Sequence, residues 1–335
     1  MRRKEQLVRT LAIGVAGAAV LAATLGGTGR AAAQVYPSRP ITMVVPFPAG
    51  GAADTLARTM AERMRISLGQ SVIIENVTGA SGSIGAGRVA RAAPDGYTLG
   101  LGNTPTHVIN GAVLALPYDV VKDFQPISLM SNAPLLIIAK KAMPANDLKE
   151  LVAWLKANPD KALQGTSGMA APSHLAGVLF QKETGTRFGF VPYRGGTAAM
   201  PDLIAGQIDM MIDPVANSLP VVRAGSIKAY AVTAKNRSAA APDIPTVDEA
   251  GAPGVHVSNW TALFAPKATP NAVIAKLNAA VVEASADPAV RARLADFGYE
   301  IFPREQQTPE ALAAFHKAEI EKWWPIIKAA GIKAE

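Results

Sequence analysis

The sequence predicts an α/β fold with two lobes, each a mostly parallel sheet flanked by helices. Two observations lead to this prediction. Short apolar and β-branched runs alternate with helical patterns along the chain, which is the order expected of parallel sheets. The chain has 335 residues. About 300 of them remain after a leader segment, and that length suggests two domains.

The first strand–turn–helix unit is the most informative stretch of the chain. Ile41–Val45 is an apolar and β-branched run that predicts a buried strand, and two prolines end it. Gly50 and Gly51 then permit a close backbone approach before a helix that begins near Asp54. The first N–H groups of that helix have no partner within it and lie at the positive end of its dipole. The unit therefore predicts an anion site made of backbone amides.

The later elements repeat this alternation of strands and helices. Asp147 is expected to cap a helix over residues 148–157, and Asn158 with Pro159 is expected to end it. Further helices are expected at residues 85–93, 172–184, 197–205, 271–286, 288–297 and 309–330. Further strands are expected at residues 72–75, 97–101, 126–130, 135–139, 163–166, 188–191, 209–212, 227–233 and 260–264.

Two crossings of the chain between lobes are expected. Residues 131–134 lie between two apolar strands and leave no room for a helix, and residues 251–254 lead into an extended run over 255–264. A pair of crossings predicts a two-segment hinge with a cleft between the lobes. We expect lobe 1 to comprise residues 35–132 and 260–335, and lobe 2 to comprise residues 133–259.

Residues 1–33 have the pattern of a signal peptide. Four basic residues lie among the first nine positions, an apolar segment covers residues 11–25, and three alanines at 31–33 offer a cleavage site before Gln34. The apolar segment is shorter than the roughly 20 residues that a membrane span needs. Arg2 and Arg3 raise the possibility of twin-arginine export, but the residues that follow them favour ordinary secretion.

The charge of the chain belongs mostly to this leader. Five basic residues and one acidic residue in it account for +4 of the formal net charge of +7, which leaves +3 for the mature chain. That value does not suggest a nucleic-acid or membrane-surface partner. The sequence contains no cysteine, which excludes disulfides, thiol nucleophiles and cysteine metal sites.

Two more glycine-rich turns follow predicted strands. Backbone amides and hydroxyls of Thr166 and Ser167 suit a carboxylate or carbonyl oxygen, although an ordinary turn capped by Ser173 fits as well. Arg194, after another strand, suits a carboxylate clamp or a surface ion pair. Ligands of open α/β sheets bind at the carboxyl ends of strands, so the three turns together favour a binding site. Ser81 and Thr104 follow two further strands and are additional candidate donors.

Several other sites are excluded or disfavoured. Residues 85–90 match a dinucleotide fingerprint in letters but do not follow a strand directly, so we interpret them as a helix start. The sequence has neither a G-x-S-x-G nucleophile motif nor a G-K-[ST] phosphate loop, and its four histidines lack metal-ligand spacing. His174 is expected to be a packing or capping histidine. Asp213 is expected to cap the next helix, or to meet an amino group of the ligand. We expect no metal and no cofactor.

The ordered motifs of the chain resemble those of the Bug-type solute-binding proteins of tripartite tricarboxylate transporters. The resemblance extends from about residue 36 to residue 332. It rests on Y-P-S-R-P-I at residues 36–41, P-F-P-A-G-G at 46–51, G-A-S-G-S-I-G at 79–85, P-D-G-Y at 94–97, P-S-H-L at 172–175, V-P-Y-R-G at 191–195 and D-I-P-T-V at 243–247.

The resemblance implies a monomeric periplasmic receptor with a type II-like fold that closes on a small carboxylated solute and delivers it to a membrane permease. It also implies that the first glycine-rich loop and its facing loop hold the carboxylate through backbone amides and water, with Asp54 as a helix-start acid. The solute would be a dicarboxylate or tricarboxylate, an amino acid or an aromatic acid. The candidate ligand-binding residues are Phe47, Pro48, Ala49, Gly50, Gly51, Ser81, Thr104, Thr166, Ser167, Gly168, Arg194 and Asp213.

Two other functions stay open. One is an exported hydrolase or lyase that uses Ser167 and His174, although no motif supplies the pairing of base and nucleophile that catalysis needs. The other is a sensor subunit of the same fold that signals to a membrane kinase. The sequence favours the receptor over the enzyme, because the capture of a carboxylate needs only well-placed N–H groups.

Overall fold

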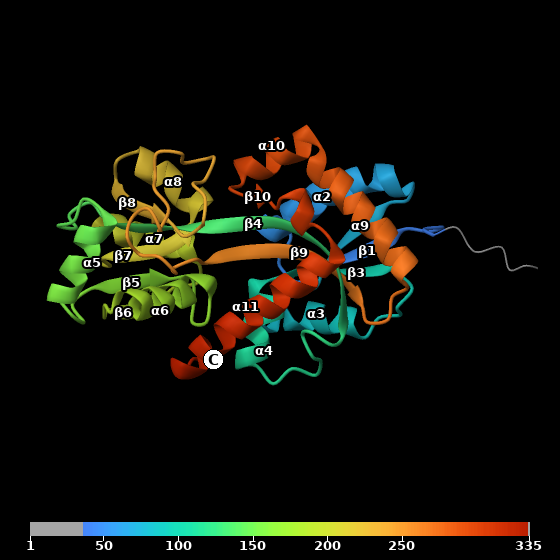
Figure 1. The fold of residues 1–335 in the computed structure, drawn as a ribbon, viewed down its shortest axis with the longest axis horizontal. Coiled ribbons are helices and arrows are strands. Elements are labelled where there is room, and N and C mark those ends of the chain that lie inside the picture. Colours follow the sequence, from blue (N-terminus) through green and yellow to red (C-terminus); the bar gives the residue numbers. More distant parts are fainter. Residues whose placement is uncertain (1–35, 334–335) are drawn as a thin grey trace, which may run out of the picture. The chain divides into compact units, whose positions relative to one another are not determined.

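The computed structural model describes residues 36–333. Arg39–Glu335 forms one compact unit, and of the other unit, Met1–Ser38, only the last three residues are described. The expected signal peptide and its cleavage before Gln34 lie outside the described residues. The architecture is α/β with two lobes, as predicted (Figure 1).

The strands of the described residues are β1 (Ile41–Val45), β2 (Val72–Asn76), β3 (Thr98–Asn103), β4 (Phe124–Lys140), β5 (Leu163–Thr166), β6 (Gly189–Pro192), β7 (Met210–Pro214), β8 (Ile227–Val232), β9 (Ser258–Pro266) and β10 (Glu300–Ile301). The α-helices are α2 (Ala52–Leu68), α3 (Ser83–Ala90), α4 (Asn110–Val113), α5 (Leu148–Ala157), α6 (Pro172–Thr184), α7 (Gly196–Ala205), α8 (Val215–Arg223), α9 (Asn271–Ala286), α10 (Pro288–Asp296) and α11 (Pro309–Ala329). A π-helical turn, η2 (Pro105–Ile109), precedes α4, and two short 3₁₀ turns are η1 (Ala80–Gly82) and η3 (Arg304–Gln306).

Each lobe contains a set of three parallel strands. In lobe 1, β1 pairs in parallel with β2 and β3, and in lobe 2, β5 pairs in parallel with β6 and β7. The antiparallel pairs all involve β4 or β9, the two long strands that run side by side between the lobes (Figure 1). The sheet is therefore mixed, because the chain leaves lobe 1 on one extended strand and returns on another that runs in the opposite direction.

The outgoing crossing is one continuous strand. We expected two strands, 126–130 and 135–139, with residues 131–134 between them, and that expectation was wrong because β4 includes all of these residues. Pairing with β9 continues through the segment, with Asn132 opposite Trp260 and Pro134 opposite Ser258. Proline lacks an N–H but is tolerated where no ladder bond needs it. The exact lobe boundaries stay a prediction, but the boundary residues on the two crossing strands do lie opposite one another.

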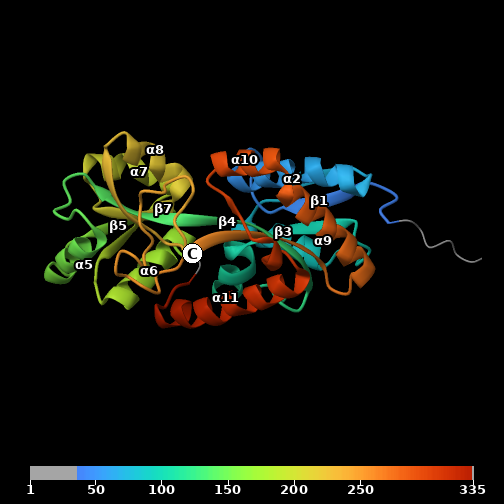
Figure 2. The same ribbon diagram turned by 45° about the horizontal axis from the view of Figure 1, so that its top comes forward.

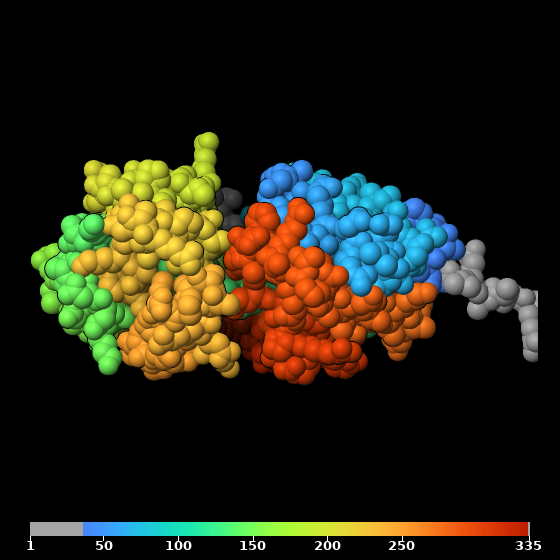
Figure 3. Space-filling view, turned by 90° about the horizontal axis from the view of Figure 1, so that it is seen from above, coloured from blue at the N-terminus to red at the C-terminus, as the bar shows by residue number. Residues whose placement is uncertain are grey.

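Helices cover both faces of each sheet. In lobe 1, α3 and α11 lie on one face and α2 and α10 on the other, and in lobe 2, α6 lies opposite α7 and α8 (Figures 1 and 2). Asp147 caps α5 as predicted, because its Oδ1 accepts a hydrogen bond from the Glu150 N–H at 2.8 Å. Figure 3 shows lobe 2, in green to gold, beside lobe 1, in blue, orange and red, with the two lobes touching along part of their boundary. Among residues 36–333, no helix is both long and apolar enough to cross a membrane.

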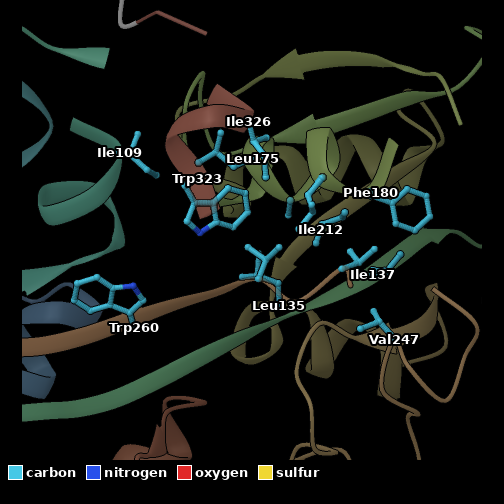
Figure 4. Close-up of a cluster of buried hydrophobic side chains, with 14 of the residues drawn as sticks. Ile109, Leu135, Ile137, Leu175, Phe180, Ile212, Val247, Trp260, Trp323 and Ile326 are labelled. Atoms are coloured by element: carbon cyan, nitrogen blue, oxygen red, sulfur yellow. The ribbon is translucent and has the colours of Figure 1, made fainter. Parts of the chain in front are cut away.

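One hydrophobic cluster extends through both lobes. Trp323 and Ile326 on α11 lie beside Leu175 of α6, with Ile109 nearby in lobe 1 (Figure 4). The same cluster continues into lobe 2 and reaches Phe180. Trp323 is 1% exposed, so α11 is a brace that buries a large aromatic surface near the crossing.

Candidate functional site

The loops that the sequence singles out lie at strand ends that point toward one another. Asn103 ends β3 and lies level with Ser131 of β4, because both residues are opposite Thr261. Pro214 ends β7 and lies opposite Leu135 of β4. These two levels are four residues apart along β4, about 13 Å at roughly 3.3 Å per residue. Since β3 runs in the direction of β4 and β7 runs against it, the carboxyl ends of both parallel sets point toward the crossing.

Asp54 organises the first glycine-rich loop. Its Oδ2 accepts hydrogen bonds from the Gly50 N–H at 2.8 Å and from Arg58 Nε at 2.9 Å. Its Oδ1 accepts from Asn76 Nδ2 at 2.9 Å, and the same amide donates to Phe47 O at 3.0 Å. Asp54 is 2% exposed. The predicted helix-start acid is therefore the buried anchor of the loop.

These hydrogen bonds keep Asp54 ionised. The bond from Arg58 contributes most to lowering its pKa to about 2, the bonds from Gly50 and Asn76 add to that effect, and burial opposes it. A lowered pKa means that the folded protein stabilises the carboxylate over the acid. At neutral pH the Asp54 side chain is therefore an ionised carboxylate, and in that form it holds the loop.

The anchor also decides which amides remain for a ligand. The Gly50 N–H is taken by Asp54, and the Gly51 N–H donates to Pro48 O at 3.3 Å. The helix itself begins at Ala52, two residues earlier than expected, with Gly51 as its N-cap. The N–H groups of the first helical turn have no intrahelical partner, so they are the better candidates for a ligand anion than those of the two glycines. Residues 48–52 are exposed.

Ser81 lies beside this loop. It is exposed and has φ of +53°, and the neighbouring Gly82 packs against Pro46 at the end of β1. Ser81 O accepts a hydrogen bond from Asn110 Nδ2 at 2.9 Å, which ties η1 to the start of α4. A left-handed backbone at a serine is uncommon and costs free energy, so the surrounding contacts impose this shape.

Thr104 has a different part in the structure. It is 1% exposed, and its hydroxyl donates to Ser258 O and accepts from the Trp260 N–H, both at 3.3 Å. The side chain therefore links the end of β3 to β9 at the crossing. These bonds use both the donor and an acceptor position of the hydroxyl.

Ser173 caps the second loop, as expected for the alternative of an ordinary turn. Ser173 is buried, and its Oγ accepts a hydrogen bond from the Ser167 N–H at 2.8 Å and lies 2.7 Å from Ser167 Oγ. Ser173 is the second residue of α6, whose N-cap is Ala171 without a side-chain bond. Thr166 Oγ1 donates to Gly168 O at 3.3 Å, and the Gly168 φ of +124° suits only glycine.

The third loop lies against the second. The Tyr193 N–H donates to Thr166 O at 2.9 Å, and Tyr193 OH donates to Asp202 at 2.6 Å. Arg194 follows directly and is exposed, and among residues 36–333 its guanidinium makes neither an ion pair nor a hydrogen bond. The predicted surface ion pair is therefore not formed. The side chain is free to meet a ligand carboxylate.

Asp213 lies at the start of two helices. It is 1% exposed, its Oδ2 accepts from Ser218 Oγ at 3.3 Å, and its Oδ1 lies directly against the Gly196 backbone at the start of α7. The expected cap of α8 is not formed, because the N-cap is Pro214 without a side-chain bond. Burial raises the pKa of Asp213 to about 6 and outweighs the hydrogen bonds from Ser218 and Asn217.

His174 is a packing and turn-stabilising residue, as predicted. Its Nδ1 accepts from the Ala170 N–H at 3.1 Å, and its ring meets Phe190 edge-on with centroids 4.6 Å apart. Burial lowers its pKa. In the described part of the chain, no three histidine, aspartate or glutamate side chains converge in a way that could hold a metal ion.

The helix starts lie at facing strand ends on two lobes that a pair of crossing strands joins, which is the arrangement expected of a solute-binding protein. The profile described as "Tripartite tricarboxylate transporter family receptor" matches residues 56–332. The chain belongs to this receptor family, whose members include the periplasmic Bug proteins.

Relatives and solved structures match this protein over nearly its whole chain. BugT of Bordetella pertussis is 34% identical over 316 residues, 94% of this chain and 96% of that protein. The structure of MatC from Rhodopseudomonas palustris with bound malate is 40% identical, has a TM-score of 0.72, and covers 87% of this chain and 100% of its own. A second Rhodopseudomonas palustris protein, with adipate, is 33% identical, has a TM-score of 0.74, and covers 89% and 99%.

Proposed function

We propose that this protein is an extracytoplasmic receptor that closes its lobes on a small carboxylate and delivers it to a tripartite tricarboxylate-type permease. The similarity to MatC and to the adipate-bound protein supports the ligand class, since malate and adipate are both dicarboxylates. The family supports the partner, a membrane permease. We propose the lobe boundaries predicted above for the moving bodies, and a monomer as the working form.

One observation carries the proposal. Helices α2 and α6 begin at strand ends that point toward the crossing from opposite lobes. The loops that precede these two helices, residues 46–51 and 167–171, contain no charged side chain. Helix starts bind anions through unpaired N–H groups and the dipole. Arg194 adds a cation beside the second of these loops, which suits a ligand with two carboxylates. The candidate site residues remain proposals at this point.

A thermal-shift panel tests the ligand class. The exported protein would be screened against monocarboxylates, malate, adipate, citrate, amino acids and aromatic acids, with the matching neutral amides as controls. A ligand at 100 times its Kd adds about 2.7 kcal/mol, which is roughly 5 °C for a protein of this size. An increase that appears with an acid and not with its amide supports carboxylate recognition. A panel without any shift at 10 mM acid would contradict the proposal.

We also propose that the protein is not an enzyme and that it works in the periplasm after cleavage before Gln34. Similarity to receptors supports the first statement, and the signal-peptide pattern with the periplasmic family supports the second. Proton NMR of the identified ligand incubated with the protein should show no product. The intact mass of the exported chain should correspond to a start at Gln34, and a product that keeps residues 1–33 would contradict it.

A further inference from the structure

A cavity of about 600 Å³ is lined by residues that the candidate ligand site does not use. Its wall is formed by residues of β4, β10 and α11 and by residues 233–236 and 256–258, the two ends of the connection from β8 to β9. None of the twelve candidate ligand-binding residues lines it. Small-molecule sites have volumes of roughly 300–1,000 Å³, so the cavity is large enough to hold a ligand of its own.

Two lysines of the cavity wall have no acidic partner. Within residues 36–333, Lys235 makes neither an ion pair nor a hydrogen bond, and Lys322 makes no ion pair. Lys322 donates one hydrogen bond, to His256 O. An ammonium group has three N–H donors, so Lys322 keeps two of them for another partner and Lys235 keeps all three.

The two ammonium groups lie close enough to repel each other. Burial lowers the pKa of Lys322, the carboxylate of Glu319 opposes that effect, and the positive charge of Lys235 adds to it. An anion between two such lysines offsets their repulsion and accepts charge-assisted hydrogen bonds from both. This part of the cavity therefore favours an anionic group.

The acidic residues of the wall do not neutralise these lysines. Glu319 Oε2 accepts hydrogen bonds from the indole N–H groups of Trp260 and Trp323, both at 3.2 Å. Glu300 lies opposite Asn132 where β10 pairs with β4. Burial raises the pKa of both acids, which means that the folded protein disfavours their charged forms. In the described part of the chain neither acid forms an ion pair, so the lysines remain available to a ligand.

Much of the remaining wall is apolar. The rings of Phe302 and Phe315 both line the cavity and meet edge-on, with centroids 5.6 Å apart and planes at 72°. Leu129 of β4 and Val257 also belong to the wall and are buried. Phe315 is partly exposed, so its ring has surface left to cover. Aromatic and aliphatic walls bind apolar groups, because burial removes both surfaces from water.

We propose that this cavity is a second binding site, for a monocarboxylate with an aromatic or branched aliphatic body. The carboxylate lies between Lys235 and Lys322, and the apolar body lies against Phe315. The inference does not depend on the carboxylate proposed for the glycine-rich loops, because the two sites share no residue. It assigns a ligand of a different kind, since the glycine-rich loops contain backbone amides rather than an aromatic wall.

The four tryptophans of the chain provide a local measurement of binding. The indoles of Trp260 and Trp323 both donate to Glu319 of the cavity wall, whereas Trp154 and Trp324 do not line the cavity. Heteronuclear NMR of the mature protein resolves the indole N–H signals, and Trp154→Phe and Trp324→Phe identify the two outer ones. Titration with 3-phenylpropionate should move the signals of Trp260 and Trp323 and leave the other two in place.

Two related compounds test the two parts of the ligand. 3-Phenylpropionamide has the ring without the charge, and propionate has the charge without the ring. Each should bind at least about tenfold more weakly than 3-phenylpropionate, because each loses one of the two interactions.

Side-chain variants place the ligand in the cavity. Lys235→Met keeps the apolar stem and removes the charge, and since Lys235 is exposed we expect a loss of roughly three- to tenfold in affinity. Ala311→Trp fills the cavity and should abolish binding. Lys317→Met is the matched control, because Lys317 is a 74%-exposed lysine of α11 outside the cavity, and it should leave the affinity unchanged. Circular dichroism melts confirm that each variant is folded.

The outcomes separate this inference from the proposed function. Gly51→Val should bind 3-phenylpropionate like the wild type, and a loss of binding in this variant would place the compound at the glycine-rich loops and overturn the inference. Indole signals that stay in place at millimolar 3-phenylpropionate would overturn it too, as would equal affinity for the amide or unchanged affinity in folded Lys235→Met and Ala311→Trp. None of these results affects the receptor proposal, which fails only if the acids of the thermal-shift panel give no shift.

Discussion

Replacing Asp54 by Asn tests whether this buried carboxylate holds the first loop as an anion. In the folded protein its pKa is about 2, against an ordinary value of 3.8. That difference corresponds to roughly 2 kcal/mol of stability at neutral pH. Arg58, its main partner, is 53% exposed, and solvent screening reduces the figure to about 1–2 kcal/mol. The expected loss in Tm at pH 7 is roughly 2–4 °C.

The pH dependence gives the sharper result. A group whose pKa is lowered by folding stabilises the protein above its unfolded pKa, and that stabilisation disappears as the pH falls through the folded pKa. The difference between the wild type and Asp54→Asn should therefore be complete above pH 5 and decrease steadily from pH 4 toward pH 2. Glu62→Gln on the same helix is the control, because the Arg65–Glu62 pair is exposed and should contribute under about 0.5 kcal/mol. Differential scanning calorimetry across this range measures both effects. A Tm difference that is absent at pH 7, or constant down to pH 2.5, would refute the reasoning.

Two further predictions concern the ligand and the brace. Gly51→Val should weaken carboxylate binding about ten- to a hundredfold in calorimetry, because the new Cβ lies 3.3 Å from Pro48 O and must shift the loop. The backbone of Gly51 is extended, with φ of −74°, a conformation that valine also adopts, so the variant should fold. If Gly51→Val binds the carboxylate like the wild type, this loop is not part of the site. Ser167→Ala on the second loop is the comparison and should weaken binding less. Trp323→Ala should lower the free energy of unfolding in urea by roughly 3–5 kcal/mol, since the side chain is 1% exposed and joins α11 to lobe 2. Phe297 is 43% exposed, so the control Phe297→Ala should lower it by under about 1 kcal/mol.

The local signals in the sequence were sufficient for most elements. The apolar run Ile41–Val45 and the cap at Asp147 depend on neighbours within four residues, and both are found as predicted. The glycine turns after β1, β5 and β6 were also identified correctly, because turn geometry depends on which residues tolerate it. The same local evidence failed at residues 131–134, where a proline suggested an interruption.

What only the tertiary structure decided depends on partners far along the chain. Pro134 belongs to a continuous strand because Ser258, more than a hundred residues later, lies opposite it, and Asn76 at the end of β2 adds a distant partner to Asp54, whose other partners Gly50 and Arg58 are four residues away. The cavity beside Lys322 exists only where α11 meets the segment around His256. By itself the sequence determined the order of strands and helices and the positions of the glycine-rich turns that we propose as anion sites, since these follow from local geometry and dipoles. The structure decided which amides, hydroxyls and carboxylates remain available to a ligand, because hydrogen bonds within the protein already use the others.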